Sequence, residues 1–235
     1  MRSPFPGFPG EALTFLRQLR RNNNRTWFVA NKETYEGKVR GPMVALVTAL
    51  GGAMQGFAPE MITDPKRAIY RIYRDVRFSR DKSPYKTHIA ATFSPMGLPK
   101  HACAGFYFHV APEAVLVAGG VYMPGPAELR AIRNHVAGHS DQLEQIVRER
   151  KFKALFRGLQ GERLARPPKG WAPDHPAIEW LRYKQYLAWL ERPARVATTT
   201  ELFRVILDAF IALMPLVRFL NAPLRAAAPA RTGTQ

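Results

Sequence analysis

Hydrophobic positions near the start of the chain recur with the spacing of an α-helix. Ala12, Phe15, Leu16 and Leu19 form one apolar stripe, and the asparagines at 22–24 that follow favour a turn. A second helical stretch is predicted from about Arg25 to Gly51-Gly52, broken or restarted at Gly41-Pro42. Its expected buried side chains are Trp27, Phe28, Tyr35, Val39, Met43, Leu46, Val47 and Leu50. The Pro- and Gly-rich residues 1–10 are expected to run extended across the surface.

From about residue 68 the period changes to two, which is typical of a β-strand. In the predicted strand Ala68–Ser79, one face carries Tyr70, Ile72, Val76 and Phe78, with Arg74 among them. The opposite face carries Arg71, Tyr73, Asp75 and Arg77.

Three further strands are predicted at His88–Phe93, Gly105–Val110 and Ala114–Tyr122. No helical pattern lies between them, which favours an antiparallel meander. Phe106, Phe108 and Val110 are expected to face the core, with Tyr107 and His109 on the other side. The pair Gly119-Gly120 indicates a bulge or a close approach of two backbones.

Helical spacing returns in the second half of the chain. Helices are predicted at Gly125–Arg150 with a break at Gly138, near Phe152–Leu159, at Ala177–Leu190, and from a capping box at Thr198 and Glu201 to about Leu220. Helices, then strands, then helices predict an α+β fold with an antiparallel sheet of about four strands within residues 68–122. We expect one domain over residues 1–222 and a disordered tail at 223–235.

Charge and cysteine content narrow the function classes. The net charge of +17 predicts attraction to polyanions such as nucleic acid or phosphorylated small molecules, although a GC-rich genome also produces arginine-rich chains. The single Cys103 excludes an internal disulfide and a multi-cysteine zinc site, and its surroundings favour plain packing. The N-terminus lacks the apolar region of a signal peptide, and charges interrupt the apolar segment Leu202–Leu220, so we expect a cytoplasmic protein without a membrane span.

The polar face of the predicted sheet is the candidate site. On a solvated face, Asp75 would only pair with flanking arginines and contribute little stability. If later helices cover this face, the same residues line a cleft that favours phosphate or carboxylate ligands, and this interpretation is preferred. The loop at 80–86 adds Lys82 and Lys86 on a backbone restrained by Pro84. The loop at 166–176 offers Lys169 and His175, and its composition alone is typical of a surface crossover.

Metal sites are weakly indicated. His135 and His139 have i, i+4 spacing but lack the glutamate of the H-E-x-x-H pattern. A divalent-metal site of Asp75, Asp81, His88 and His109 is disfavoured by the many cations nearby. The sequence identifies no metal, no cofactor and no oligomeric state.

The string R-D-V-R-F-S-R-D-K-S-P-Y-K, with N-N-N-R-T-W-F before it and P-K-G-W-A-P-D-H-P after it, resembles the bacterial and fungal family called domain of unknown function 2461. The resemblance runs from about Phe5 to about Leu190. It implies that the Lys169–His175 loop belongs to the site, and it implies no mechanism, because the family has no established activity.

Three hypotheses follow. The first is a pocket that binds a phosphate-bearing ligand, a nucleotide or a nucleic-acid end, through Arg71, Tyr73, Arg77, Lys82, Tyr85, Lys86, Tyr107 and Lys169. The second is a hydrolase or transferase acting on such a ligand, with His109 or His175 as acid–base group near Asp75 or Asp81. The third is a structural or interaction protein, in which the Arg–Asp network only holds the fold together.

Overall fold

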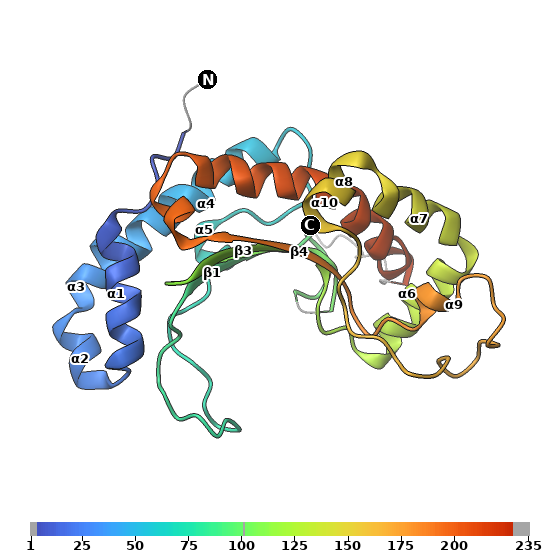
Figure 1. The fold of residues 1–235 in the computed structure, drawn as a ribbon, viewed down its shortest axis with the longest axis horizontal. Coiled ribbons are helices and arrows are strands. Elements are labelled where there is room, and N and C mark those ends of the chain that lie inside the picture. The colour runs from blue at the N-terminus through green and yellow to red at the C-terminus, as the bar shows by residue number, and fades with distance from the viewer. Residues whose placement is uncertain (1–3, 101, 228–235) are drawn as a thin grey trace, which may run out of the picture. The chain divides into compact units, whose positions relative to one another are not determined.

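The computed structural model describes residues 4–100 and 102–227, which divide into two compact units (Figure 1). The first unit contains residues 4–93, 107–117 and 190–211. The second contains residues 94–100, 102–106, 118–189 and 212–227. The expectation of one domain over residues 1–222 stays a prediction.

The helices of the first unit follow the predicted apolar stripes. They are α1 (Gly10–Arg21), α2 (Arg25–Ala30), α3 (Lys32–Thr34), a π-helical turn (Tyr35–Arg40), α4 (Gly41–Met54) and α5 (Pro65–Ala68). The α1 stripe is buried as expected. The side chain of Asn24 caps α2 by accepting a hydrogen bond from the Trp27 N–H at 2.9 Å. Pro42 lies in the first turn of α4, which follows directly on the π-helical turn.

Within residues 4–10, two aromatic side chains are buried, contrary to the expectation that residues 1–10 run across the surface. Phe5 and Phe8 are almost completely buried, and their rings meet edge to face at 5.6 Å. The Phe8 N–H donates to the Ala197 carbonyl at 2.8 Å. Burial of two aromatic side chains outweighs the tendency of a Pro- and Gly-rich segment to stay solvated.

The sheet confirms the α+β class. Its strands are β1 (Ile89–Phe93), β2 (Gly105–Val110), β3 (Ala114–Val121) and β4 (Tyr186–Pro193), hydrogen-bonded antiparallel in the order β1-β2-β3-β4. The predicted helix Ala177–Leu190 is wrong over most of its length, because α9 covers only Ile178–Leu181. In β4, Tyr186, Ala188 and Leu190 alternate as buried residues, which is the period of a strand.

The predicted strand Ala68–Ser79 is also wrong as a regular strand. Residues 69–88, which we call the arm, leave the sheet after Tyr70 donates its N–H to the Ala90 carbonyl at 2.9 Å. The arm then pairs with itself through an isolated antiparallel bridge between Tyr73 and Tyr85. In Figure 1 it is the long excursion between α5 and β1. Among the described residues, the arm therefore pairs with a strand of the sheet only at its first residues.

The two faces of the sheet differ in burial where β1 and β2 run side by side. Phe106, Phe108 and Val110 are fully buried as predicted. Phe210 of α10 contacts Phe93 and Phe108, with ring centroids 5.6 Å and 6.5 Å away. On the opposite face, Thr92, Tyr107 and His109 stay partly exposed. This second face continues into the root of the arm.

The second unit holds α6 (Pro126–Gly138), α7 (Ser140–Arg148), α8 (Arg150–Phe156) and α9. The predicted break at Gly138 separates α6 from α7, and α8 begins slightly before the helix expected there. The predicted close approach at Gly119-Gly120 is confirmed. Gly120 has φ +122°, and a Cβ added there would lie 2.0 Å from the Tyr186 carbonyl oxygen.

The last helix is longer than expected. α10 runs from Glu201 to Ala227, past the predicted end near Leu220 and into the predicted tail, of which 228–235 lie outside the described residues. Thr199 rather than Thr198 accepts from the Glu201 N–H, at 3.3 Å. Within the described part of the chain, no helix has the length and apolarity needed to cross a membrane.

Candidate functional site

The arm is a two-stranded excursion held by a few backbone hydrogen bonds. Arg74 donates its N–H to the Pro84 carbonyl at 2.9 Å, and Lys86 donates its N–H to the Ile72 carbonyl at 2.8 Å. These bonds flank the Tyr73–Tyr85 bridge, so the backbone N–H and carbonyl of Tyr85 point away from Tyr73. Isolated hairpins are marginal in water. The arm therefore needs support from other elements of the first unit.

That support comes from the start of α2. The Asn23 side chain donates to the Tyr85 carbonyl at 2.9 Å and accepts from the Tyr85 N–H at 3.0 Å. Phe28 stacks on the Tyr85 ring at 4.1 Å with an interplanar angle of 19°. Tyr85 is buried, and burial raises the pKa of its phenol. Tyr85 therefore anchors the arm, and its ring is not open to a ligand as the ligand-binding prediction requires.

Lys86 links the two sides of the arm at its root. Its ammonium group donates to the Arg71 carbonyl at 2.7 Å and to the Tyr73 carbonyl at 2.9 Å. Partial burial lowers the pKa of Lys86, and the charges of Arg71 and Arg74 lower it further. Two of its three N–H donors are used inside the protein, which leaves one for a ligand.

Both carboxylates of the arm are bound by arginines of the arm. Arg77 forks onto Asp75 with distances of 3.0 Å and 2.7 Å, and this side-chain contact lowers the pKa of Asp75 to about 2. Asp81 accepts from the Ser83 N–H at 2.9 Å and pairs with Arg74. Hydrogen bonds from Ser83, ahead of the Arg74 contact, hold the pKa of Asp81 far below its usual range. Neither carboxylate is arranged to accept a proton near neutral pH.

Two arginines of the arm remain unengaged. Among the described residues, the side chains of Arg71 and Arg80 form no hydrogen bond or ion pair, and both residues are exposed. By contrast, Lys82 donates to the Val76 carbonyl at 3.0 Å. Arg80 lies in the predicted cationic loop at 80–86 but is not among the predicted ligand-binding residues. The tip of the arm thus adds a cation that the sequence pattern did not single out.

The aromatic side chains of the arm differ from the predicted pattern. Phe78, assigned to the apolar face of the predicted strand, is 95% exposed, and Tyr73 on the other face is 52% exposed. The Arg77 guanidinium lies 5.8 Å from the centre of the Phe78 ring. The preferred interpretation of an enclosed cleft is therefore wrong for Arg71, Tyr73, Asp75 and Arg77, all of which are solvent-exposed because the segment leaves the sheet.

A polar aromatic cluster lies at the root of the arm. The Tyr107 hydroxyl is 3.0 Å from Nδ1 of His109, and the rings of His88 and His109 are 4.9 Å apart. Tyr70 meets Tyr107 edge to face at 6.3 Å. Burial lowers the pKa of His109, and burial together with His109 and Lys86 lowers that of His88 to about 4. Both imidazoles are therefore neutral at pH 7.

The remaining predicted residues, Lys169 and His175, belong to the second unit. Lys169 is exposed beside Gly170, which has φ +99°. The His175 ring accepts from the Ala177 N–H at 3.1 Å through Nδ1 and so fixes the local turn. Their participation in the site stays a prediction.

Among the described residues, no three His, Cys, Asp or Glu side chains are grouped so that they could hold a metal ion. The ring centres of His135 and His139 lie 4.3 Å apart with the rings tilted by 30°, and His139 Nδ1 is 2.9 Å from the His135 carbonyl. Cys103 is buried, and burial raises its pKa to about 11, consistent with a packing role.

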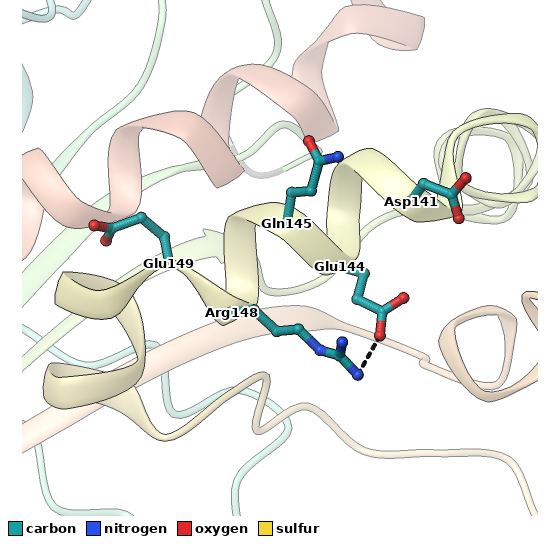
Figure 2. Close-up of a pocket in the computed structure, with 5 residues that line it drawn as sticks. All are labelled: Asp141, Glu144, Gln145, Arg148 and Glu149. Carbon is teal, nitrogen blue, oxygen red and sulfur yellow. Dashed lines mark ion pairs between the residues drawn. The ribbon is translucent and has the colours of Figure 1, made fainter.

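A separate depression lies on the second unit along α7. Figure 2 shows its lining side chains, Asp141, Glu144, Gln145, Arg148 and Glu149. Arg148 pairs with Glu144, which leaves Asp141 and Glu149 to give the surface a negative charge. This depression is therefore unsuited to a phosphate-bearing ligand.

Comparison with known proteins shows a family match over most of the chain. A family model described as "Conserved hypothetical protein (DUF2461)" matches residues 11–219. The chain belongs to this family. The match includes the arm, the β1–β4 sheet and both loops singled out in the sequence. No curated protein matches the chain. Membership in the DUF2461 family identifies no ligand and no reaction.

Proposed function

We propose that this DUF2461 protein binds a phosphate-bearing ligand, a nucleotide or a nucleic-acid end, through the cations of the arm. The observation that carries the proposal is the division of charge within residues 71–86. Six cationic residues stand against two carboxylates there, a net charge of +4. Both carboxylates are neutralised by Arg74 and Arg77. The side chains of Arg71 and Arg80 form no hydrogen bond or ion pair among the described residues.

The engaged cations have a supporting role in this proposal. Arg77, Lys82 and Lys86 hold Asp75 and backbone carbonyls, so they shape the arm while adding to its positive potential. Arg71 and Arg80 supply guanidinium groups that can bind phosphate oxygens in pairs. The arm is exposed, so its attraction to a polyanion is screened at salt concentrations near 0.15 M and is strongest at low salt.

Salt-dependent binding tests the proposal. Fluorescence anisotropy with a labelled oligonucleotide is measured for the wild type and for an Arg71→Ala/Arg80→Ala variant at several salt concentrations. Loss of two phosphate contacts should lower the log–log salt slope by about 1.4 for a single strand. An Arg150→Ala/Lys151→Ala variant removes the same charge from the exposed start of α8 and serves as control. Equal binding by wild type and arm variant rules out the arm as the site.

An enzymatic role is a second candidate, supported by the cluster at the root of the arm. A neutral imidazole can accept a proton, and the hydrogen bond with the Tyr107 hydroxyl orients the imidazole ring of His109. The contacts of His109 are with Tyr107 and His88, whereas Asp75 and Asp81 bond to residues of the arm. The predicted His–Asp pair therefore has no support from these contacts. A His109→Ala variant that keeps binding and loses turnover of a phosphoester substrate would establish catalysis.

The structural alternative makes a contrasting prediction. If the Arg–Asp pairs only hold the arm, Asp75→Ala lowers the melting temperature and no anion raises it. A thermal-shift screen with nucleotides, sugar phosphates, polyphosphate and oligonucleotides separates these outcomes, because a ligand that binds the native state stabilises it by mass action.

A further inference from the structure

The most exposed large apolar side chain among the described residues is Phe78, at the tip of the arm. Single exposed apolar residues are common and need no explanation by themselves. Phe78 differs through its surroundings, because Arg77, Arg80 and Lys82 lie within four residues of it and the Arg77 guanidinium lies near its ring. A flat aromatic surface surrounded by cations is the combination that binds unpaired bases and their phosphates together.

We infer that Phe78 is a stacking platform for an unpaired base, so that the preferred ligand of the arm is single-stranded nucleic acid. The inference rests on the proposed function, in which the arm binds phosphates, and it specifies the class of ligand. In this arrangement a base stacks on Phe78 while Arg71 and Arg80 contact the phosphates of the same strand. Tyr73, half exposed and five residues earlier, offers a second ring on the arm.

The contacts that hold the arm in place favour binding of a single strand. Arg77 pairs with Asp75 just before Phe78 in the sequence, and Arg74 pairs with Asp81 across the tip that contains Phe78. Asn23 and Phe28 hold the arm at Tyr85. A platform that is already ordered loses less conformational entropy on binding than a mobile loop does.

A single strand fits these features better than a duplex or a membrane. The bases of a duplex are stacked on one another and present no free face to a side chain in an exposed loop. Membrane insertion by the tip would depend on Phe78 almost alone, since Val76 is half buried and the other tip residues are polar. One aromatic side chain gives weak anchoring compared with the several apolar residues of a membrane-binding segment.

The test compares two oligonucleotides with equal phosphate content, an oligothymidylate of about 15 nucleotides and an abasic strand of the same length. Wild type should bind the oligothymidylate between about 5-fold and 100-fold more tightly, which corresponds to stacking of one base. Phe78→Ala should abolish this preference and leave the salt slope unchanged, because it removes no charge. Phe78→Trp should keep the preference. Tyr122→Ala, which removes an exposed aromatic ring outside the arm, should behave as wild type.

The outcomes separate this inference from the proposed function. If Arg71→Ala/Arg80→Ala weakens binding to both strands while Phe78→Ala preserves the preference for oligothymidylate, the stacking role is wrong and the phosphate-binding role stands. If neither variant affects binding of either strand, both are wrong. If Phe78→Ala lowers binding only to phosphatidylserine vesicles, the tip contacts membranes and the inference is overturned. Unchanged melting temperatures confirm that each variant is folded.

Discussion

The side chain of Asn23 completes both backbone hydrogen bonds of Tyr85, a residue 62 positions later in the sequence. It donates to the carbonyl at 2.9 Å and accepts from the N–H at 3.0 Å. An amide side chain carries one acceptor and two donors, so it can replace the neighbouring strand that the arm lacks on this side. The contact joins the turn between α1 and α2 to the arm.

Replacement of Asn23 by Ala should therefore destabilise the arm. Two partly buried backbone groups of Tyr85 lose their partners, and we expect the free energy of unfolding to fall by about 1–3 kcal/mol. Urea denaturation measures this loss, and trypsin cleavage after Arg77 or Arg80 should accelerate because the arm opens more often. Asn22→Ala is the matched control, since Asn22 bonds only to the exposed Gln18 carbonyl within α1. Equal effects of the two substitutions would contradict the bracing role.

The parts of the fold that could be predicted are those where burial follows the intrinsic period of one element. In α1 and in β2, the residues on one face are buried and those on the other face are more exposed. The prediction failed at β4, where Ile178, Leu181 and Leu187 fit helical spacing while Tyr186, Ala188 and Leu190 fit strand spacing. Short apolar segments are ambiguous between the two periods. This segment forms a strand through its hydrogen bonds with β3, and the local sequence pattern does not predict that pairing.

The charged segment 71–86 could be recognised from the sequence, but the arrangement of its side chains could not. The R-D-V-R-F-S-R-D-K string identified the charged segment correctly. Alternation along the string placed Phe78 on the apolar face with Ile72, but Phe78 is exposed because the segment leaves the sheet. The Asp75–Arg77 and Asp81–Arg74 pairs depend on side-chain directions in a turn, which sequence spacing does not give.

Gly120 should tolerate no side chain. Its φ of +122° is unfavourable for any L-residue with a Cβ, and the added carbon would lie 2.0 Å from the Tyr186 carbonyl oxygen. Gly120→Ala should reduce the free energy of unfolding by more than about 4 kcal/mol, or prevent recovery of folded protein. Gly138→Ala is the control, because a Cβ there meets no atom within 4 Å. A Gly120→Ala variant as stable as the control would contradict the close approach of β3 and β4.

The His88–His109 contact should make the stability of the protein depend on pH below neutrality. An unfolded histidine has a pKa of about 6.5, whereas burial with His109 and Lys86 lowers that of folded His88 to about 4. Between these values the unfolded state binds more protons than the folded state, so the free energy of unfolding falls as the pH decreases. For His88 alone the loss should be on the order of 2 kcal/mol between about pH 6.5 and pH 5.

Urea denaturation at a series of pH values measures this loss, and His88→Gln should make the pH dependence shallower, because glutamine does not titrate. His109, whose pKa burial also lowers, should account for part of the remaining slope. Asp75 and Asp81 do not interfere, since their lowered pKa values place their contribution below about pH 4. Tyr122→Ala, remote in sequence from both histidines, controls for a general effect of substitution. An identical slope in wild type and His88→Gln would mean that His88 is protonated in the folded protein as readily as in the unfolded chain.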